Sequence, residues 1–112
     1  MSILFLGACE KDNDYGDVLL TFKYQDKSLP QPVFYMKKGT LTAPSIPLSD
    51  YDKSISGDAV GQATFENLEP GNYFFYGKAY NTLSSAYVTG GIGVTIKSRY
   101  RQNWYDMTID GE

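Results

Sequence analysis

The stretch ATFENLEPGNYFFYGKAYN, residues 63–81, decides the fold of this chain. It places the turn sequence Glu-Pro-Gly-Asn between two segments in which inward and outward positions alternate. Pro70 presets the backbone angle φ at the start of such a turn, and Gly71 takes the positive φ that the turn requires. Tyr73 then begins a segment that runs to about Tyr80 and is predicted to be a strand. The stretch therefore predicts two β-strands joined by a tight corner.

The rest of the chain shows the same period of two residues, which is typical of half-buried strands. Further strands are predicted over residues 18–24, 33–37, 93–97 and 104–109. Residues 39–58 lack this period and are rich in Pro, Ser, Asp and Gly, so we expect a long connection with one short strand or helical turn. Aromatic residues make up 15% of the 112 residues, and they suit pleated sheets. The composition therefore also favours an all-β fold.

The corner residues resemble a feature of known β-sandwich domains. They are Leu68, Pro70, Gly71 and Tyr73, in the order Leu-x-Pro-Gly-x-Tyr. In such a corner the tyrosine hydroxyl donates a hydrogen bond to the backbone a few residues upstream. The longer string FENLEPGNY, residues 65–73, resembles the transthyretin-like or carboxypeptidase-regulatory-like domains of bacterial surface proteins. The resemblance implies a seven-stranded Ig-like or transthyretin-like β-sandwich over residues 18–110, acting as a spacer or binding module without shared catalytic residues.

A second motif lies at the start of the chain. Leu6, Gly7 and Ala8 precede Cys9, the single cysteine, and this order resembles the bacterial lipobox. In proteins with that motif the cysteine is acylated, so the resemblance implies a lipid anchor at Cys9. Residues 1–8 would then be a residual signal segment, and because a working export signal is basic and longer, we expect its true start upstream. The alternative is that this apolar start is a first strand with Cys9 buried as a small hydrophobe.

Residues 9–17 would comprise the acylated cysteine and an acidic tether. In residues 10–17 the acids outnumber the single lysine and aliphatic residues are absent, so the segment has little to bury. It is similar to the acidic stretch that follows the acylated cysteine in surface-exported lipoproteins of the Bacteroidota. That similarity implies a domain anchored by lipid to the outer membrane and exposed at the surface, with the periplasmic-facing leaflet as the alternative location.

Two absences narrow the chemistry of the chain. It has no histidine and only one cysteine. Histidine is the usual proton carrier near neutral pH, and His and Cys are the common ligands of zinc. We therefore expect no catalytic site, no metal site and no cofactor. The net charge of −3 also argues against the clustered basic surface that binds phosphates, so no nucleic-acid partner is expected.

Two other sequence patterns are only superficially similar to functional sites. Asp50, Asp52 and Asp58 lie in the long connection, where carboxylates are typically solvent-facing turn caps. The sequence GGIG, residues 90–93, is similar to part of a phosphate-binding loop. It lacks the Lys-Ser/Thr pair and the helix that such a loop needs, so a flexible hairpin turn is the better interpretation.

Alternation also divides the aromatic residues between the two faces of their strands. Tyr76 and Tyr80 fall on the outward side of one predicted strand, whose inward residues are Tyr73, Phe75, Gly77 and Ala79. Trp104 falls on the outward side of the last strand, and Ile109 on its inward side. If the two strands share a sheet, these three rings form an exposed platform that could stack on sugar rings or seat protein anchors. The alternative is that the rings merely cover sheet edges and lysine stems.

Together these patterns predict a lipid-anchored surface protein that is a non-catalytic binding or spacer module. Its expected partners are the membrane, through the lipid, and a glycan or an envelope protein. One alternative is a structural subunit of a surface assembly, such as a pilus or a nutrient-uptake complex, in which strands are donated or accepted. A less favoured alternative is a glycosidase that works with carboxylates alone, which would need two facing acids in a cleft.

Overall fold

The computed structural model describes residues 15–97 and 103–112. The predicted signal segment, Cys9 and most of the predicted tether therefore lie outside the described residues. The last residues of that tether, from Gly16 on, belong to the first strand. Within the described ranges, no helix is both long and apolar enough to cross a membrane.

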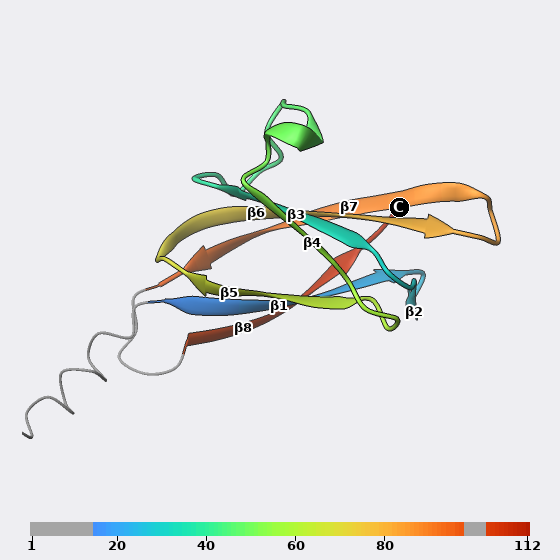
Figure 1. The fold of residues 1–112 in the computed structure, drawn as a ribbon, viewed down its shortest axis with the longest axis horizontal. Coiled ribbons are helices and arrows are strands. Elements are labelled where there is room, and N and C mark those ends of the chain that lie inside the picture. Colours follow the sequence, from blue (N-terminus) through green and yellow to red (C-terminus); the bar gives the residue numbers. More distant parts are fainter. Residues whose placement is uncertain (1–14, 98–102) are drawn as a thin grey trace, which may run out of the picture.

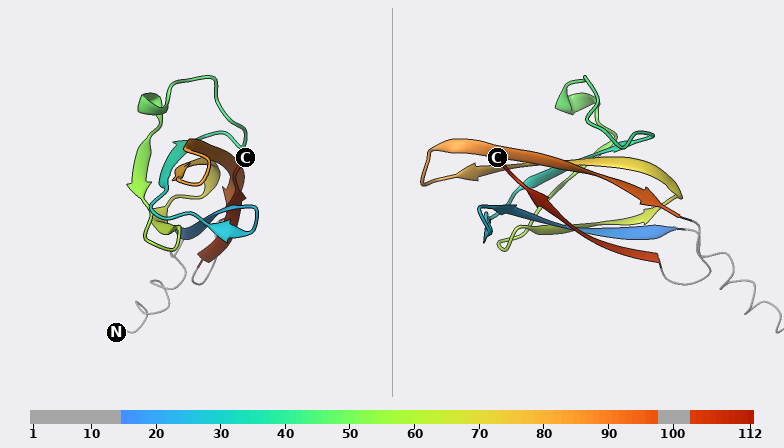
Figure 2. Two further views of the ribbon diagram at one scale, coloured as in Figure 1. Left: turned by 90° about the vertical axis from the view of Figure 1, so that its right-hand side faces the viewer. Right: turned by 180° about the vertical axis from the view of Figure 1, so that it is seen from behind.

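Two four-stranded sheets pack face to face (Figures 1 and 2). One sheet, called sheet A, contains β1 (Gly16–Tyr24), β2 (Lys27–Ser28), β5 (Gln62–Leu68) and β8 (Asn103–Asp110). The other, called sheet B, contains β3 (Val33–Lys38), β4 (Lys53–Ser56), β6 (Gly71–Asn81) and β7 (Ala86–Ile96), in the order β4-β3-β6-β7. The all-β sandwich is confirmed, with 62% of the described residues in strands.

The sandwich has eight strands instead of the predicted seven. The additional strand is β2, which forms a hairpin with the end of β1. Gln25 and Asp26 form the two-residue turn between them, with φ angles of 52° and 65°. Positive φ at both turn residues matches the right-handed twist of a tight hairpin. No strand of only two residues was predicted here from the sequence.

The long connection after β3 contains both elements that the sequence left open. A single turn of 3-10 helix, η1 (Leu48–Asp50), precedes the short strand β4. Asp52, which lies between η1 and β4, connects this segment to the end of β3, because its Oδ2 accepts a hydrogen bond of 2.7 Å from the backbone N–H of Lys38. Asp58 likewise caps the next turn, since its Oδ1 accepts from the N–H groups of Val60 and Gln62.

The core lies between the inward faces of the two sheets. β1 and β8 pair in parallel, and the inward residues of one strand lie beside the inward residues of the other. The cross-strand pairs are Val18 with Tyr105, Leu20 with Met107, and Phe22 with Ile109. From sheet B, the inward residues of β6 are Tyr73, Phe75, Gly77 and Ala79, all buried as the alternation predicted. After β8 the chain crosses to sheet B, where Glu112 and Thr89 exchange backbone hydrogen bonds.

The predicted corner connects β5 in sheet A with β6 in sheet B. The hydroxyl of Tyr73 donates a hydrogen bond of 2.6 Å to the backbone carbonyl of Glu69, and Leu68 is buried beside it. Gly71 has a φ of 150°, as the turn sequence predicted. The carboxylate of Glu69 also pairs with Lys38 Nζ at 2.6 Å, which lowers the pKa of Glu69 and raises that of Lys38. The corner thus fixes how the chain passes between the sheets.

Replacing Tyr73 with phenylalanine is expected to lower the free energy of unfolding by about 1–2 kcal/mol, because the Glu69 carbonyl loses its donor. Burial raises the pKa of Tyr73 above its ordinary value of 10.0. The neutral hydroxyl is therefore favoured by folding, and its contribution is complete below pH 10 and declines as the pH rises through the raised pKa. Urea unfolding at several pH values measures the difference from wild type. Tyr24→Phe, a partly exposed tyrosine, is the control, and an equal effect of both changes would contradict this role.

The interpretation of residues 90–93 as a hairpin turn is wrong, because these residues lie inside β7. Their glycines are needed where other groups approach the strand. A Cβ atom added to Gly91 would lie 2.3 Å from Cζ of Phe74, and one added to Gly93 would lie 2.3 Å from the carbonyl oxygen of Leu41. The missing side chains therefore let Phe74 and the long connection lie against the outer face of sheet B.

Candidate binding face

The structure does not form the predicted platform of three aromatic rings. Tyr76 and Tyr80 lie on β6 in sheet B, whereas Trp104 lies on β8 in sheet A. Because the inward faces of the two sheets meet in the core, their outward side chains point to opposite sides of the sandwich (Figure 1). Trp104 is 49% exposed on the outer side of sheet A, beside the N-terminal end of β1. The prediction that the three rings share a surface is therefore wrong.

Tyr76 has two other tyrosines as neighbours on the outer face of sheet B. Tyr35 of β3 is its cross-strand partner, and their ring centroids lie 6.2 Å apart. Tyr51, which follows η1, completes the group at 6.0 Å from Tyr35 and 6.4 Å from Tyr76. Partial burial raises the pKa of Tyr51, with a smaller contribution from Tyr76, so its hydroxyl stays neutral at physiological pH. These three residues are called the central tyrosines.

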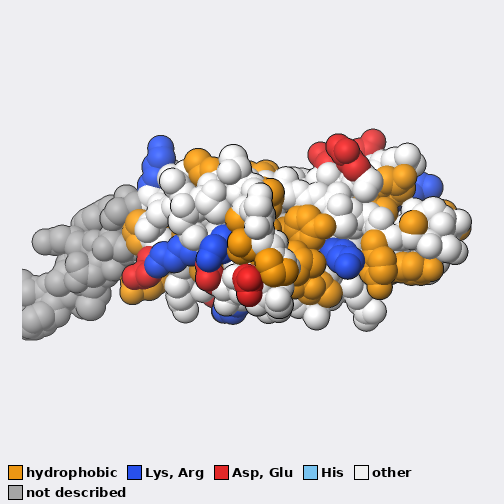
Figure 3. All heavy atoms as spheres, turned by 90° about the horizontal axis from the view of Figure 1, so that it is seen from above, with side chains coloured by type: hydrophobic (Ala, Val, Ile, Leu, Met, Phe, Trp, Pro, Cys, Tyr) orange, Lys and Arg blue, Asp and Glu red, His pale blue; other side chains and the backbone are white. Residues whose placement is uncertain are grey.

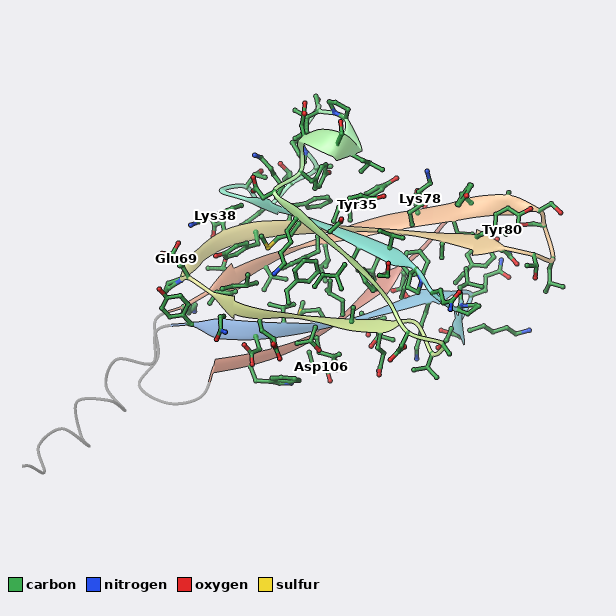
Figure 4. The ribbon with its side chains drawn as sticks, in the orientation of Figure 1. Tyr35, Lys38, Glu69, Lys78, Tyr80 and Asp106 are labelled. Carbon is green, nitrogen blue, oxygen red and sulfur yellow. The ribbon has the colours of Figure 1, made fainter. Side chains whose placement is uncertain are left out.

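A second pair of tyrosines extends this face toward the hairpin between β6 and β7. Tyr80 and Tyr87 are cross-strand partners whose rings meet edge to face at 5.2 Å. They are 44% and 62% exposed. Lys78 places its Nζ 4.6 Å from the ring centroid of Tyr87, within the range of a cation–π interaction. Figure 4 shows Lys78 on the same side of sheet B as Tyr35. Tyr80 and Tyr87 are called the distal tyrosines.

Two of the central tyrosines, Tyr35 and Tyr51, and both distal tyrosines line two hollows on this side of the sheet. The first, of about 550 Å³, lies between Tyr35, Tyr51 and the loop that carries Leu48. The second, of about 450 Å³, lies between Tyr35, Lys78 and the distal tyrosines. Tyr35 lines both hollows, so they adjoin at this ring. The two hollows together with Tyr76, which lies beside Tyr35, are called the tyrosine face. Figure 3 looks onto this side of the molecule and shows hydrophobic side chains gathered along it with basic groups between them.

Some of the lysines around this face form ion pairs with carboxylates and others do not. Lys37 Nζ lies 3.4 Å from Asp52, and Lys38 pairs with Glu69. Lys78 forms no ion pair with a carboxylate in the described part of the chain, and its ammonium group lies over the ring of Tyr87. In residues 15–97 and 103–112, no group of three or more acidic, Cys or His side chains is arranged to hold a metal ion. The face therefore offers aromatic rings, hydroxyls and two lysines without an ion pair among the described residues, Lys78 in the second hollow and Lys53 in the first.

Two residues of this face were not singled out from the sequence: Tyr35 and Tyr87. Tyr35 had a usable signal, since it alternates with the inward residues Phe34 and Met36. Tyr87 lies in a segment that was not predicted as a strand. Only the pairing of β3, β6 and β7 brings these residues to Tyr76 and Tyr80.

Comparisons with known proteins address the fold. No family model matches the chain, and no curated protein matches it. Four solved chains match its structure. One is a variant of BcpA, the major pilin subunit of Bacillus cereus, with a TM-score of 0.55 and 18% identity, over 88% of this chain and 30% of that one. Another is a 9R-lipoxygenase from Cyanothece, with a TM-score of 0.43 and 12% identity, over 87% of this chain and 16% of that one. This chain thus spans less than a third of either protein, and the likeness to the pilin subunit supports the β-sandwich fold.

Proposed function

We propose that this chain is a non-catalytic binding module of the bacterial cell surface, anchored by lipid at Cys9, which binds a glycan or an envelope protein through the tyrosine face. The observation that supports this function is the arrangement of five tyrosine rings on one outward sheet face. Tyrosine contributes large contact area with little loss of conformational entropy, and its ring and hydroxyl serve apolar and polar contacts together. A surface of this kind suits recognition of another molecule better than it suits a spacer.

The direction of the strands supports the proposed anchoring. β1 begins at one end of the sandwich, and the hairpin between β6 and β7 projects from the opposite end (Figure 1). A lipid on Cys9, seven residues before β1, would hold the first end near the membrane. The distal tyrosines and Leu83, which is 91% exposed at the hairpin, would then face away from the membrane. The carboxylates of Asp52 and Asp58 accept hydrogen bonds from backbone N–H groups, so both side chains have a structural role in stabilising their loops.

The binding role is tested by changing the distal tyrosines. Tyr80→Ser with Tyr87→Ser is expected to weaken binding at least tenfold, because tyrosine is enriched among the few interface residues whose truncation costs more than about 1 kcal/mol. Binding is measured by affinity electrophoresis against a panel of polysaccharides and by pull-down of solubilised envelope protein. Trp104→Ser is the matched control, since it removes an exposed ring from the opposite sheet. Equal binding by the double variant and wild type to every ligand would refute the tyrosine face.

The anchor is tested separately by the intact mass of the protein isolated from its native membrane. We expect a chain that begins at Cys9 and carries acyl mass on that residue. Cys9→Ser is expected to release the protein into the soluble fraction. A native chain that keeps residue 8 before Cys9 and has a free thiol at Cys9 would rule out lipidation. The binding role of the tyrosine face would then rest only on the binding experiment.

A second candidate function is a structural subunit of a surface assembly. In the described part of sheet A, β5 and β8 each pair with β1 on one side only, so each leaves an edge to which another chain could add a strand. The match to a pilin subunit is consistent with this fold being used in that way. Concentration-dependent oligomers in light scattering would favour it. A monomer at all concentrations, with binding lost in the distal tyrosine variant, would favour the binding module.

A further inference from the structure

We propose that the second hollow binds an acidic polysaccharide, with Lys78 pairing with a uronate carboxylate and the surrounding tyrosines holding the sugar rings. This inference rests on the proposed function, because it names the class of ligand for the same tyrosine face. It is carried by three features of the hollow: an unpaired cation, rings on either side of it, and a sheet whose backbone is already paired.

Lys78 has a charge that the described protein does not neutralise. Lys37 and Lys38, on the neighbouring strand β3, each pair with a carboxylate. Lys78 instead lies over the ring of Tyr87 and is only partly exposed. Contact with the ring holds the ammonium group at a defined place without satisfying its three N–H donors. A ligand carboxylate can therefore form a charge-assisted hydrogen bond there without displacing an existing partner.

The rings beside Lys78 provide contacts for sugars. Tyr35 lies on one side of the hollow and the distal tyrosines lie on the other. The negative face of an aromatic ring attracts the weakly positive C–H groups on the flat side of a sugar ring. Gln31 and Thr82 add an amide and a hydroxyl to the lining, where they can exchange hydrogen bonds with sugar hydroxyls. The hollow thus combines apolar ring faces with polar groups and one cation.

The pairing of the strands beneath the hollow favours a sugar over an acidic peptide. An extended peptide usually binds by adding a strand to a sheet edge, where backbone groups are free. β6 lies inside sheet B and pairs with β3 on one side and β7 on the other. The backbone of β6 is therefore already paired, and a ligand that lies over β6 contacts its side chains. A chain of rings with hydroxyls and carboxylates can make all its contacts with them.

Charge on the whole molecule also bears on the ligand. The chain has a net charge of −3, so it does not attract acidic polymers over a distance. Affinity for a polyuronate must then come from the local contact at Lys78 and the adjacent rings. We therefore expect loss of one charge on the ligand or on Lys78 to matter more than the bulk ionic strength of the buffer.

The experiment compares two polymers with the same backbone and different charge. The full chain is titrated by calorimetry with oligogalacturonate and with the same oligomer methyl-esterified, and dextran oligomers serve as a neutral reference. Wild type is expected to bind the acid at least tenfold more tightly than the ester. Lys78→Gln is expected to weaken binding of the acid about tenfold and leave the ester unchanged, while Lys78→Arg keeps the preference for the acid. Lys27→Gln, an exposed change on β2 in sheet A, is the control and should behave as wild type.

The outcomes separate this inference from the proposed function. Equal binding of acid and ester, both lost with Tyr80→Ser and Tyr87→Ser, would overturn the uronate but leave the binding module. Tighter binding of poly-glutamate than of oligogalacturonate, dependent on Lys78, would overturn the sugar in favour of a peptide. If no oligomer binds, and envelope proteins bind equally to wild type and the tyrosine variant, the proposed function fails as well. Thermal melting of each variant confirms that it is folded before it is compared.

Discussion

Replacing Phe22 with alanine is expected to lower the free energy of unfolding by about 3–5 kcal/mol. Phe22 is 0% exposed and its ring lies 6.4 Å from that of Phe34 across the core. Gly77 and Gly111 lie directly against this ring, where neither contributes a side chain that could fill the cavity. Domains of this size are usually stable by about 5–15 kcal/mol, so the change removes a large part of the total. Urea denaturation followed by circular dichroism measures it.

The control for this variant is Asp106→Ala. Asp106 points away from the core on the outer side of sheet A (Figure 4) and is exposed. Exposed changes of this kind usually alter stability by less than about 0.5 kcal/mol. A loss below about 1 kcal/mol for Phe22→Ala, or a similar loss in both variants, would contradict the placement of Phe22 at the centre of the core.

Replacing Gly77 with alanine is expected to destabilise the protein by about 1–3 kcal/mol, because it overpacks the core. A Cβ atom at this position would lie 2.6 Å from Cδ2 of Phe22 and 3.3 Å from Cε1 of Phe34. Both rings are buried, so neither can turn away into solvent. Thermal and urea unfolding measure the loss. In the absence of a clash, alanine would stabilise the strand relative to glycine, because glycine loses more conformational entropy on folding. A gain in stability would therefore show that the two sheets are farther apart than the structure has them.

The two variants also test each other, since they change opposite sides of one contact. If Gly77 is needed to make room for the ring of Phe22, the cost of Gly77→Ala should largely disappear when Phe22 is already alanine. The double variant should then be more stable than the sum of the single losses predicts, by about 1 kcal/mol or more. Strictly additive losses would mean that the two residues do not touch.

The faces of the strands could be predicted from the sequence, because the period of two residues is a local property. It placed Tyr73, Phe75 and Ile109 in the core and Trp104 outside it, as the structure has them. The corner was also predictable, since the proline, the glycine and the tyrosine that form it lie within four residues. These features need no knowledge of which strands are neighbours.

The neighbours of each strand could not be predicted in the same way. β8 pairs in parallel with β1, although the paired residues lie 87 positions apart in the sequence (103 − 16 for Gly16 and Asn103), and no local pattern indicates that pairing. The aromatic platform failed for this reason, because it required β8 to lie in the sheet of β6. The prediction of a turn at the glycines of residues 90–93 failed for a related reason. Their small size accommodates Phe74 and Leu41, which are distant in the sequence, and local reasoning assigned them to a turn.

The central claim is that the outer face of sheet B binds the ligand and the outer face of sheet A does not. The most direct measurement is a two-dimensional amide NMR titration with the oligosaccharide that binds most tightly. Because the chain has a single tryptophan, the indole N–H of Trp104 gives one unambiguous signal for sheet A. We expect shifts at Tyr35, Lys78 and Tyr87 and none at the Trp104 indole or Asp106. Shifts centred on the Trp104 indole and β8, with the signals of β6 and β7 unchanged, would contradict the account.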